Sequence, residues 1–160
     1  MFRKLFIVFS FVILLMGLSG CDLLTGPSDE KVIVKIETIK DAKEFVAEVA
    51  DSAAEMEQGL MYRESLDDNQ AMLFDLRKPS YASLWMKNTL IPLDMIFIDE
   101  DLNIVDIFKD VQPCATETCE NYASEHKVRY LLEINGGLSD DYSINFGDKI
   151  NISTLEGDSV

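Results

Sequence analysis

The sequence WMKNTLIPLD at residues 85–94, which continues into an apolar run, decides how this chain folds. It holds the sole tryptophan of the chain, Trp85, and places Lys87, Asn88 and Asp94 in an otherwise apolar, strand-forming region. Buried polar groups need hydrogen-bond partners because water is scarce around them. We therefore expect a strand, a turn and a second strand here, with the polar side chains fixed at the corner.

Around this corner, short apolar segments, several of them alternating with polar residues, are separated by turn-forming residues, and such segments predict β-strands. Residues 53–61, which Asp51 and Ser52 can cap, and the turn at 139–141 predict short helices. The predicted strands are 32–37, 44–50, 71–76, 81–86, 93–98, 103–108, 128–135 and 149–153. The sequence thus predicts a mainly β fold, a compact β-sandwich or barrel of about seven or eight short strands, with an α+β arrangement as the alternative.

The N-terminus has the features of a lipoprotein signal. Arg3 and Lys4 precede the apolar segment 5–16, and the sequence LSGC ends at Cys21. A basic start, an apolar centre and small residues before a cleavage point are typical of secretory signals, and this apolar segment is short for a membrane span. LSGC also resembles the lipobox of bacterial lipoproteins, whose cysteine is lipidated and becomes the mature N-terminus. An uncleaved membrane helix is the alternative.

The expected organisation is a lipoprotein signal peptide at 1–20, a lipidated tether at 21–30, one β-rich domain at 31–153 and a frayed tail at 154–160. Acyl chains such as palmitate on Cys21 would hold the domain at the membrane, facing the periplasm or the exterior. Asp22 resembles the signal that retains lipoproteins in the inner membrane of some two-membrane bacteria.

The chain is strongly acidic. Its formal net charge is −15, which becomes −17 once Arg3 and Lys4 are removed with the signal. This charge repels phosphate backbones and offers no basic patch, so we expect no nucleic-acid partner. We interpret the acidic residues as a solvated surface.

Two cysteines follow Cys21, and they are separated by four residues at Cys114 and Cys119. This spacing is compatible with a local disulfide in an oxidising compartment. It is not the C-x-x-C motif of thiol oxidoreductases, and the sequence offers no second cysteine pair or histidine cluster for zinc. A structural bridge is favoured over redox or metal chemistry, and we expect neither a metal nor a cofactor.

Several short motifs, in this order, resemble a known family. They are QGLMYR at 58–63, AMLF at 71–74, WMKNTLIPLD at 85–94, LEI at 132–134, GG at 136–137 and GD at 147–148. The resemblance, over residues 43–153, is to the bacterial and archaeal domain of unknown function number 192. It implies a compact β-rich domain, often secreted or membrane-anchored, without an established activity or catalytic residues. It also implies a cysteine-containing loop that some members have, which supports the disulfide.

The residue types favour binding over catalysis. The single histidine, His126, lies in a charged segment, which argues against a Ser-His-Asp triad. Lys87 and Asp94 flank a short turn and could approach one another. Together with Trp85 and Asn88 they could form a polar latch that fixes strand register, or a shallow pocket for a sugar or another small polar solute.

We therefore expect a membrane-anchored extracytoplasmic lipoprotein that acts as a small binding or accessory module, with no catalytic residue assigned. One alternative is a hydrolase that uses Asp94 and Glu133 as acid and base, which requires both carboxyl groups at one cleft. Another is an interaction module for envelope proteins. The candidate ligand-binding residues are Arg63, Trp85, Lys87, Asn88, Asp94 and Glu133.

Overall fold

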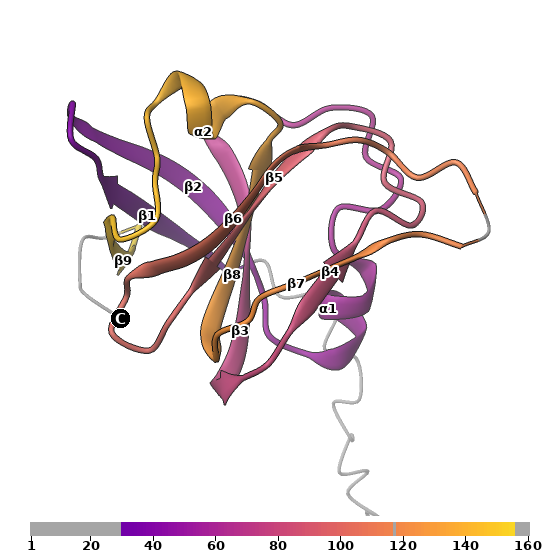
Figure 1. Cartoon of the computed structure of the whole chain (residues 1–160), viewed down its shortest axis with the longest axis horizontal. Helices are drawn as coiled ribbons and strands as arrows, with labels where there is room; N and C mark the ends of the chain where they lie inside the picture. Colours follow the sequence, from indigo (N-terminus) through magenta and orange to yellow (C-terminus); the bar gives the residue numbers. More distant parts are fainter. Residues whose placement is uncertain (1–29, 117, 156–160) are drawn as a thin grey trace, which may run out of the picture.

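The computed structural model describes residues 30–116 and 118–155, which form a curled, mainly antiparallel β-sheet (Figure 1). The strands are β1 (Lys31–Glu37), β2 (Ala42–Ala50), β3 (Gln70–Ser80), β4 (Ser83–Trp85), β5 (Leu93–Ile98), β6 (Ile104–Val111), β7 (Asn121–Ala123), β8 (Val128–Asn135) and β9 (Lys149–Thr154). The helices are α1 (Ala53–Gln58) and α2 (Leu138–Asp141). The predicted signal peptide, the tether before residue 30 and residues 156–160 of the predicted tail lie outside the described residues, whereas Thr154, also placed in that tail, is the last residue of β9.

The mainly β prediction is confirmed. Seven strands form one sheet in the order β6-β5-β8-β3-β2-β1-β9, which curls into a half-barrel. Strand twist brings the two edge strands together at one end, where Asn103 pairs with Lys149 and the Ile104 N–H donates to the Asp148 carbonyl at 2.9 Å. Every strand pair of this sheet is antiparallel except β2 and β3, which α1 connects.

The structure shifts several ends of the predicted strands, shortening 81–86 to β4 and extending 103–108 to Val111 in β6, and it differs most in β3 and β7. β3 continues past residue 76 to Ser80, because a register shift after Asp75, with Arg77 at φ 63°, lets the strand bend before it pairs again. β7 was not predicted. It pairs with β4, and its Tyr122 ring packs edge-on against Phe108 at 5.4 Å between centroids, a tertiary contact that a short polar segment does not reveal.

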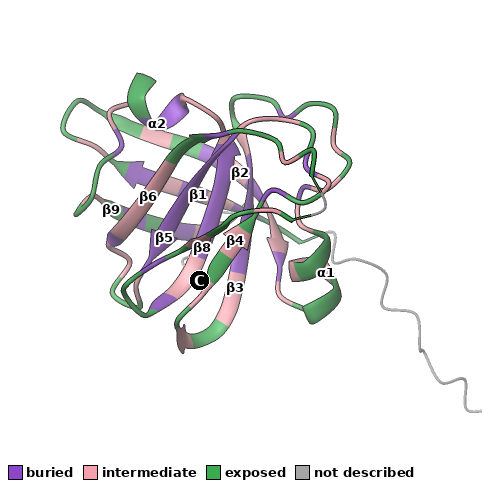
Figure 2. Cartoon of the chain, turned by 45° about the vertical axis from the view of Figure 1, so that its right-hand side comes forward, coloured by how far each residue is buried: buried purple, intermediate pink, exposed green. Residues whose placement is uncertain are grey.

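The sheet buries apolar residues on both faces. One cluster, which includes Val34, Phe45 and Ile96, receives residues from all seven strands of the main sheet inside the curl. The other, which includes Phe74 and Met95, lies on the opposite face, with residues of the loops after α1 and β4. β5 is buried along its whole length, so its apolar run is continuous rather than alternating (Figure 2).

Helix α1 begins with a capping box, in which Ser52 takes the capping role that the sequence predicts. The Ser52 hydroxyl accepts the Glu55 N–H at 3.3 Å, while the Glu55 carboxylate accepts the Ser52 N–H at 3.0 Å. The helix ends at Gly59, whose φ of 45° lies in the region that favours glycine. These two signals limit α1 to a short helix between the parallel strands.

The buried carboxylate of Asp94 joins β5 to two other segments. It accepts backbone N–H groups from Asp110 at 2.7 Å, Gly137 at 2.9 Å and Ser139 at 2.6 Å. Asp110 belongs to β6, whereas Gly137 and Ser139 lie at the start of α2. Asp94 is therefore a latch that fixes strand register, and its partners are backbone groups rather than Lys87.

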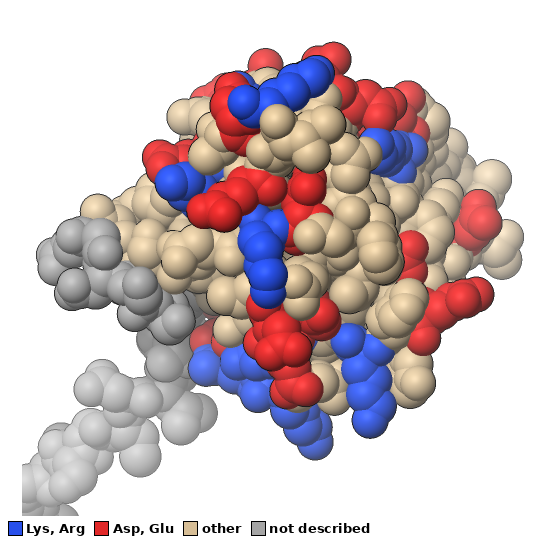
Figure 3. All heavy atoms as spheres, turned by 60° about the vertical axis from the view of Figure 1, so that its left-hand side comes forward, with Lys and Arg blue, Asp and Glu red and all other residues tan. Residues whose placement is uncertain are grey.

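A disulfide closes the loop between β6 and β7. Cys114 Sγ and Cys119 Sγ lie at bonding distance, 2.09 Å apart. On the face drawn in Figure 3, Asp and Glu side chains are interspersed with Lys and Arg. Across residues 30–155, with 117 excepted, no helix has the length and apolar character needed to cross a membrane.

We predict a graded loss of stability at Asp94. Asp94→Ala removes the acceptor of several buried N–H groups and should lower the free energy of unfolding by at least about 3 kcal/mol. Asp94→Asn keeps one carbonyl oxygen and should lose less. Urea denaturation followed by circular dichroism measures both, with exposed Asp141→Ala as the control, expected within about 0.5 kcal/mol of wild type. Equal stability of Asp94→Ala and the control would contradict the latch.

Candidate functional site

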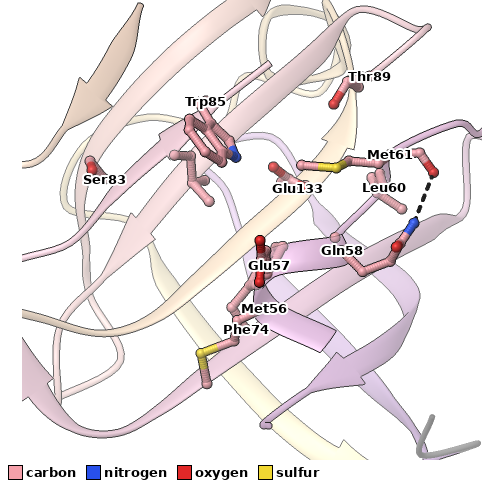
Figure 4. A pocket seen from close by; sticks show the side chains of 12 residues that line it. Met56, Glu57, Gln58, Leu60, Met61, Phe74, Ser83, Trp85, Thr89 and Glu133 are labelled. Atoms are coloured by element: carbon pink, nitrogen blue, oxygen red, sulfur yellow. Dashed lines mark hydrogen bonds between the residues drawn. The ribbon is translucent and has the colours of Figure 1, made fainter. Parts of the chain in front are cut away.

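Two adjoining hollows lie beside Trp85, between α1 with its following loop and the segment from β4 to Thr89. The outer hollow has a volume of about 320 Å³ and is lined by Ala54, Glu57, Gln58, Met61, Tyr62, Trp85, Lys87 and Asn88. The inner cavity, of about 70 Å³, is lined by Met56, Glu57, Gln58, Gly59, Leu60, Met61, Phe74, Ser83, Leu84, Trp85, Thr89 and Glu133 (Figure 4). Because the two share residues of α1, Met61 and Trp85, we treat them as one candidate site.

Trp85 lies between the two hollows. Its side chain is partly exposed, at 40% for the residue, although large aromatic residues are usually mostly buried. The Lys87 ammonium lies 5.0 Å from the centre of the indole ring, a cation–π contact. Trp85 and Lys87 thus share one side of the chain, as the strand period of two predicts. No ion pair joins Lys87 to another described residue, so its charge is available to the outer hollow.

The rim of the outer hollow is held by contacts between two loops. The Tyr62 N–H donates to the Asn88 carbonyl at 2.8 Å, and the Asn88 side-chain amide lies 3.9 Å from the Met61 sulfur. Tyr62 and Asn88 both have positive φ, at 64° and 56°. Asparagine tolerates this conformation, whereas for tyrosine it costs on the order of 1–3 kcal/mol. The loops are therefore held in a specific geometry at the rim.

Glu133 provides a buried acid at the inner cavity. It lies on β8 opposite Met72 of β3 and Met95 of β5, and is 4% exposed. The carboxyl makes no hydrogen bond or ion pair with any other described residue. Burial raises the pKa of Glu133 from 4.5 to about 8, so at neutral pH this group is a carboxylic acid that can donate a hydrogen bond.

The inner cavity brings other polar groups near Glu133. Figure 4 shows the nitrogen-bearing edge of Trp85 turned toward Glu133, and the carboxylate of Glu57 on α1 directed to the same cavity. The Trp85 N–H has no hydrogen-bond partner among the described residues. Donors without a protein partner around a cavity are typical of binding sites.

Asp94, proposed from the sequence as a ligand-binding residue, is not part of this site. In the register of β5 with β8, Met95 pairs with Glu133 and Asp94 pairs with Ile134. Because successive residues of a strand point to opposite faces, the Asp94 and Glu133 carboxyl groups lie on opposite faces of the sheet. They cannot flank one substrate, which removes this pair as the acid and base of a hydrolase.

Arg63 also lies outside the two hollows. Its guanidinium binds the Glu48 carboxylate on β2 through two hydrogen bonds, one of 2.9 Å. The hydrogen bond from Arg63 lowers the pKa of Glu48, and the same bond raises the pKa of Arg63. Arg63 therefore fixes the loop after α1 to the sheet, while Trp85, Lys87, Asn88 and Glu133 come together as the candidate site.

The family DUF192, described as uncharacterized ACR, matches residues 34–152 of the sequence. This chain belongs to that family. The match confirms the resemblance seen in the motifs. No curated protein is significantly similar to this DUF192 protein.

Two crystal structures are similar to this DUF192 domain. A protein of unknown function from Novosphingobium aromaticivorans DSM 12444 is 34% identical, with a TM-score of 0.71 over 75% of this chain and 84% of that one. A protein from Sinorhizobium meliloti 1021, provisionally described as a transcription regulator, is 32% identical, with a TM-score of 0.72 over 79% of this chain and 98% of that one. Both share the fold, and neither description names a ligand.

The sequence did not single out the wall of the site formed by α1 and its loop. Glu57, Gln58, Met61 and Tyr62 line the hollows, and three of these four lie in the motif QGLMYR. That motif was a signal of family membership rather than of chemistry. The described residues contain no group of three or more His, Cys, Asp or Glu side chains arranged to hold a metal ion.

Glu133 makes the stability of the domain depend on pH. The folded state keeps a proton that the unfolded chain releases between pH 4.5 and about 8. Its contribution is fully present below pH 4.5, falls as the pH rises and levels off above about pH 8. Since Glu133→Gln removes this titration, the variant should gain on the order of 4 kcal/mol relative to wild type between about pH 5 and about pH 8.5. Urea denaturation at both pH values measures the difference, and parallel curves for the two proteins would contradict the assignment.

Proposed function

We propose that this DUF192 domain binds a small polar solute, such as a sugar, in the outer hollow beside Trp85. The observation that carries the proposal is the partly exposed indole of the sole tryptophan at a hollow of about 320 Å³. This volume is within the range of small-molecule sites. An aromatic ring next to hydrogen-bonding side chains suits a ligand with one apolar face and a polar edge.

The polar groups of the outer hollow can orient such a ligand. Lys87 supplies a charged donor, and the amides of Gln58 and Asn88 supply both donors and acceptors. Gln58 is bound only at 3.5 Å, to the Met61 carbonyl, so its amide can turn to a ligand with little loss. Binding is favoured over hydrolysis because Asp94 and Glu133 face opposite sides of the sheet.

We further propose that the domain is held at the membrane by a lipid on Cys21 and faces the periplasm or the exterior. The support is the basic start, the apolar segment and LSGC before Cys21, together with the acidic charge that disfavours nucleic-acid partners. Asp22 favours the inner membrane of a two-membrane bacterium. A solute-binding domain at this place would meet sugars of the cell envelope or of the medium.

Trp85 provides a direct test of solute binding, because its fluorescence reports on this site alone. Titration of the full-length protein, in a detergent without a sugar headgroup, with a panel of neutral mono- and oligosaccharides should change its emission for at least one member. Calorimetry should show that Trp85→Ala abolishes binding and that Lys87→Ala weakens it about tenfold. Tyr81→Ala, an exposed aromatic residue outside the hollows, is the matched control and should bind as wild type. A panel without any emission change or heat would contradict the proposal.

Membrane anchoring is tested at the cysteine. Cys21→Ser removes the group that receives lipid, so the domain should move from the membrane fraction to the soluble fraction after cell lysis. Cys114→Ser, which leaves the anchor intact, serves as the control and should stay in the membrane fraction. Persistence of Cys21→Ser at the membrane after a salt wash would overturn the lipoprotein assignment.

A further inference from the structure

The polar groups of the inner cavity indicate which kind of ligand group it would hold. Glu133, which lines it, is 4% exposed and has no hydrogen-bond partner among the residues that the structure describes. The Trp85 N–H, on the edge turned toward Glu133, also has no hydrogen-bond partner among the described residues (Figure 4). Both groups border the cavity, where a ligand group of matching chemistry can take the place of water.

The two groups together select a hydrogen-bond acceptor. An indole N–H can only donate, and a protonated carboxyl has one O–H to donate. A carbonyl oxygen has two lone pairs and can accept from both donors. Neither of these two donors can accept from an ammonium group, whose acceptor at this cavity would be the Glu57 carboxylate.

The size and walls of the inner cavity limit which ligand groups can fit. Its volume is about 70 Å³, compared with about 30 Å³ for one water molecule in the liquid, so it admits a group of a few heavy atoms. Leu60, Phe74 and Met61 form an apolar wall that suits a methyl group. The hydroxyl of Thr89, which lines the same cavity, can accept an amide N–H.

We propose that the solute is an N-acetylated sugar whose acetamido group enters the inner cavity while its ring lies against Trp85 in the outer hollow. The acetamido carbonyl accepts from Glu133 and Trp85, and its methyl group contacts Leu60 and Phe74. This inference rests on the proposed function, because it names the ligand class of the same site.

The assignment of Glu133 predicts a pH dependence of its own. When the pH rises through about 8, the carboxyl loses its proton and presents a negative charge to the ligand carbonyl. Glu57 on α1 is the other charged residue that lines the inner cavity, whereas Lys87 faces the outer hollow. Glu57→Gln therefore tests whether the pH dependence of binding arises from Glu133 rather than from Glu57.

Calorimetry on the full-length protein with N-acetylglucosamine, glucosamine and glucose tests the inference. Wild type should bind N-acetylglucosamine at least about tenfold more tightly than the other two sugars at pH 7, and this preference should fall about tenfold by pH 9.5. Glu133→Gln keeps a donor without titrating, so it should retain the preference at both pH values. Glu133→Leu should lose the preference while it still binds glucose. Glu57→Gln changes a charge at the same cavity, so its affinities can differ from wild type, but its preference should still fall between pH 7 and pH 9.5 as that of wild type does.

The outcomes separate the two levels of the proposal. Equal binding of N-acetylglucosamine and glucose by wild type would overturn the acetamido assignment and leave solute binding intact. A preference retained by Glu133→Leu would overturn the role of Glu133. Absence of heat with every sugar, including the panel members used for Trp85, would overturn the proposed function itself.

Discussion

The three backbone N–H groups that converge on the Asp94 carboxylate hold the centre of this fold in place. They tie β5 to β6 and to the start of α2, directly after β8. Gly136 allows the chain to pass close by, since a Cβ there would lie 2.8 Å from the Pro92 side chain and 2.9 Å from that of Asp110. These contacts set the register of β5 against β8, and a shift by one residue would send Glu133 to the other face of the sheet. The inner cavity thus depends on a carboxylate that is not part of it.

Asp94 and Glu133 show two ways to bury a carboxyl group in neighbouring strands. The Asp94 carboxylate accepts hydrogen bonds from three backbone N–H groups, so it can stay buried in a structural role. Glu133 has no such donors among the described residues, and burial raises its pKa to about 8. A latch between strands needs a carboxylate that backbone N–H groups stabilise. A site for an uncharged hydrogen-bond acceptor would instead need a protonated carboxyl group that can donate. Strongly perturbed and unpartnered groups in a cavity are typical of functional sites.

The sequence predicted much of the fold because strand period and capping are local properties. Alternation in 32–37 and 44–50 and compact apolar runs elsewhere identified the strands of the main sheet, and Asp51 with Ser52 identified the start of α1. It also placed Trp85 and Lys87 on one side of the chain. The site was predicted only in part, because the pairing of Met95 with Glu133 joins residues far apart in sequence. The face that α1 presents to Trp85 similarly depends on the crossover from β2 to β3, which no local pattern reveals.

Two residues at the rim of the site, Tyr62 and Asn88, have strained backbone conformations. Tyr62 and Asn88 adopt left-handed conformations on the two loops that one hydrogen bond joins, with Met61 beside both hollows. Figure 4 shows the flexible Met61 side chain extended toward Glu133, where it lines the inner cavity. The packed face that includes Phe74 and Met95 offsets the conformational cost, which is on the order of 1–3 kcal/mol for a strained residue. Because the cavity is formed before a ligand arrives, binding would lose less conformational entropy than in a loop that must order itself.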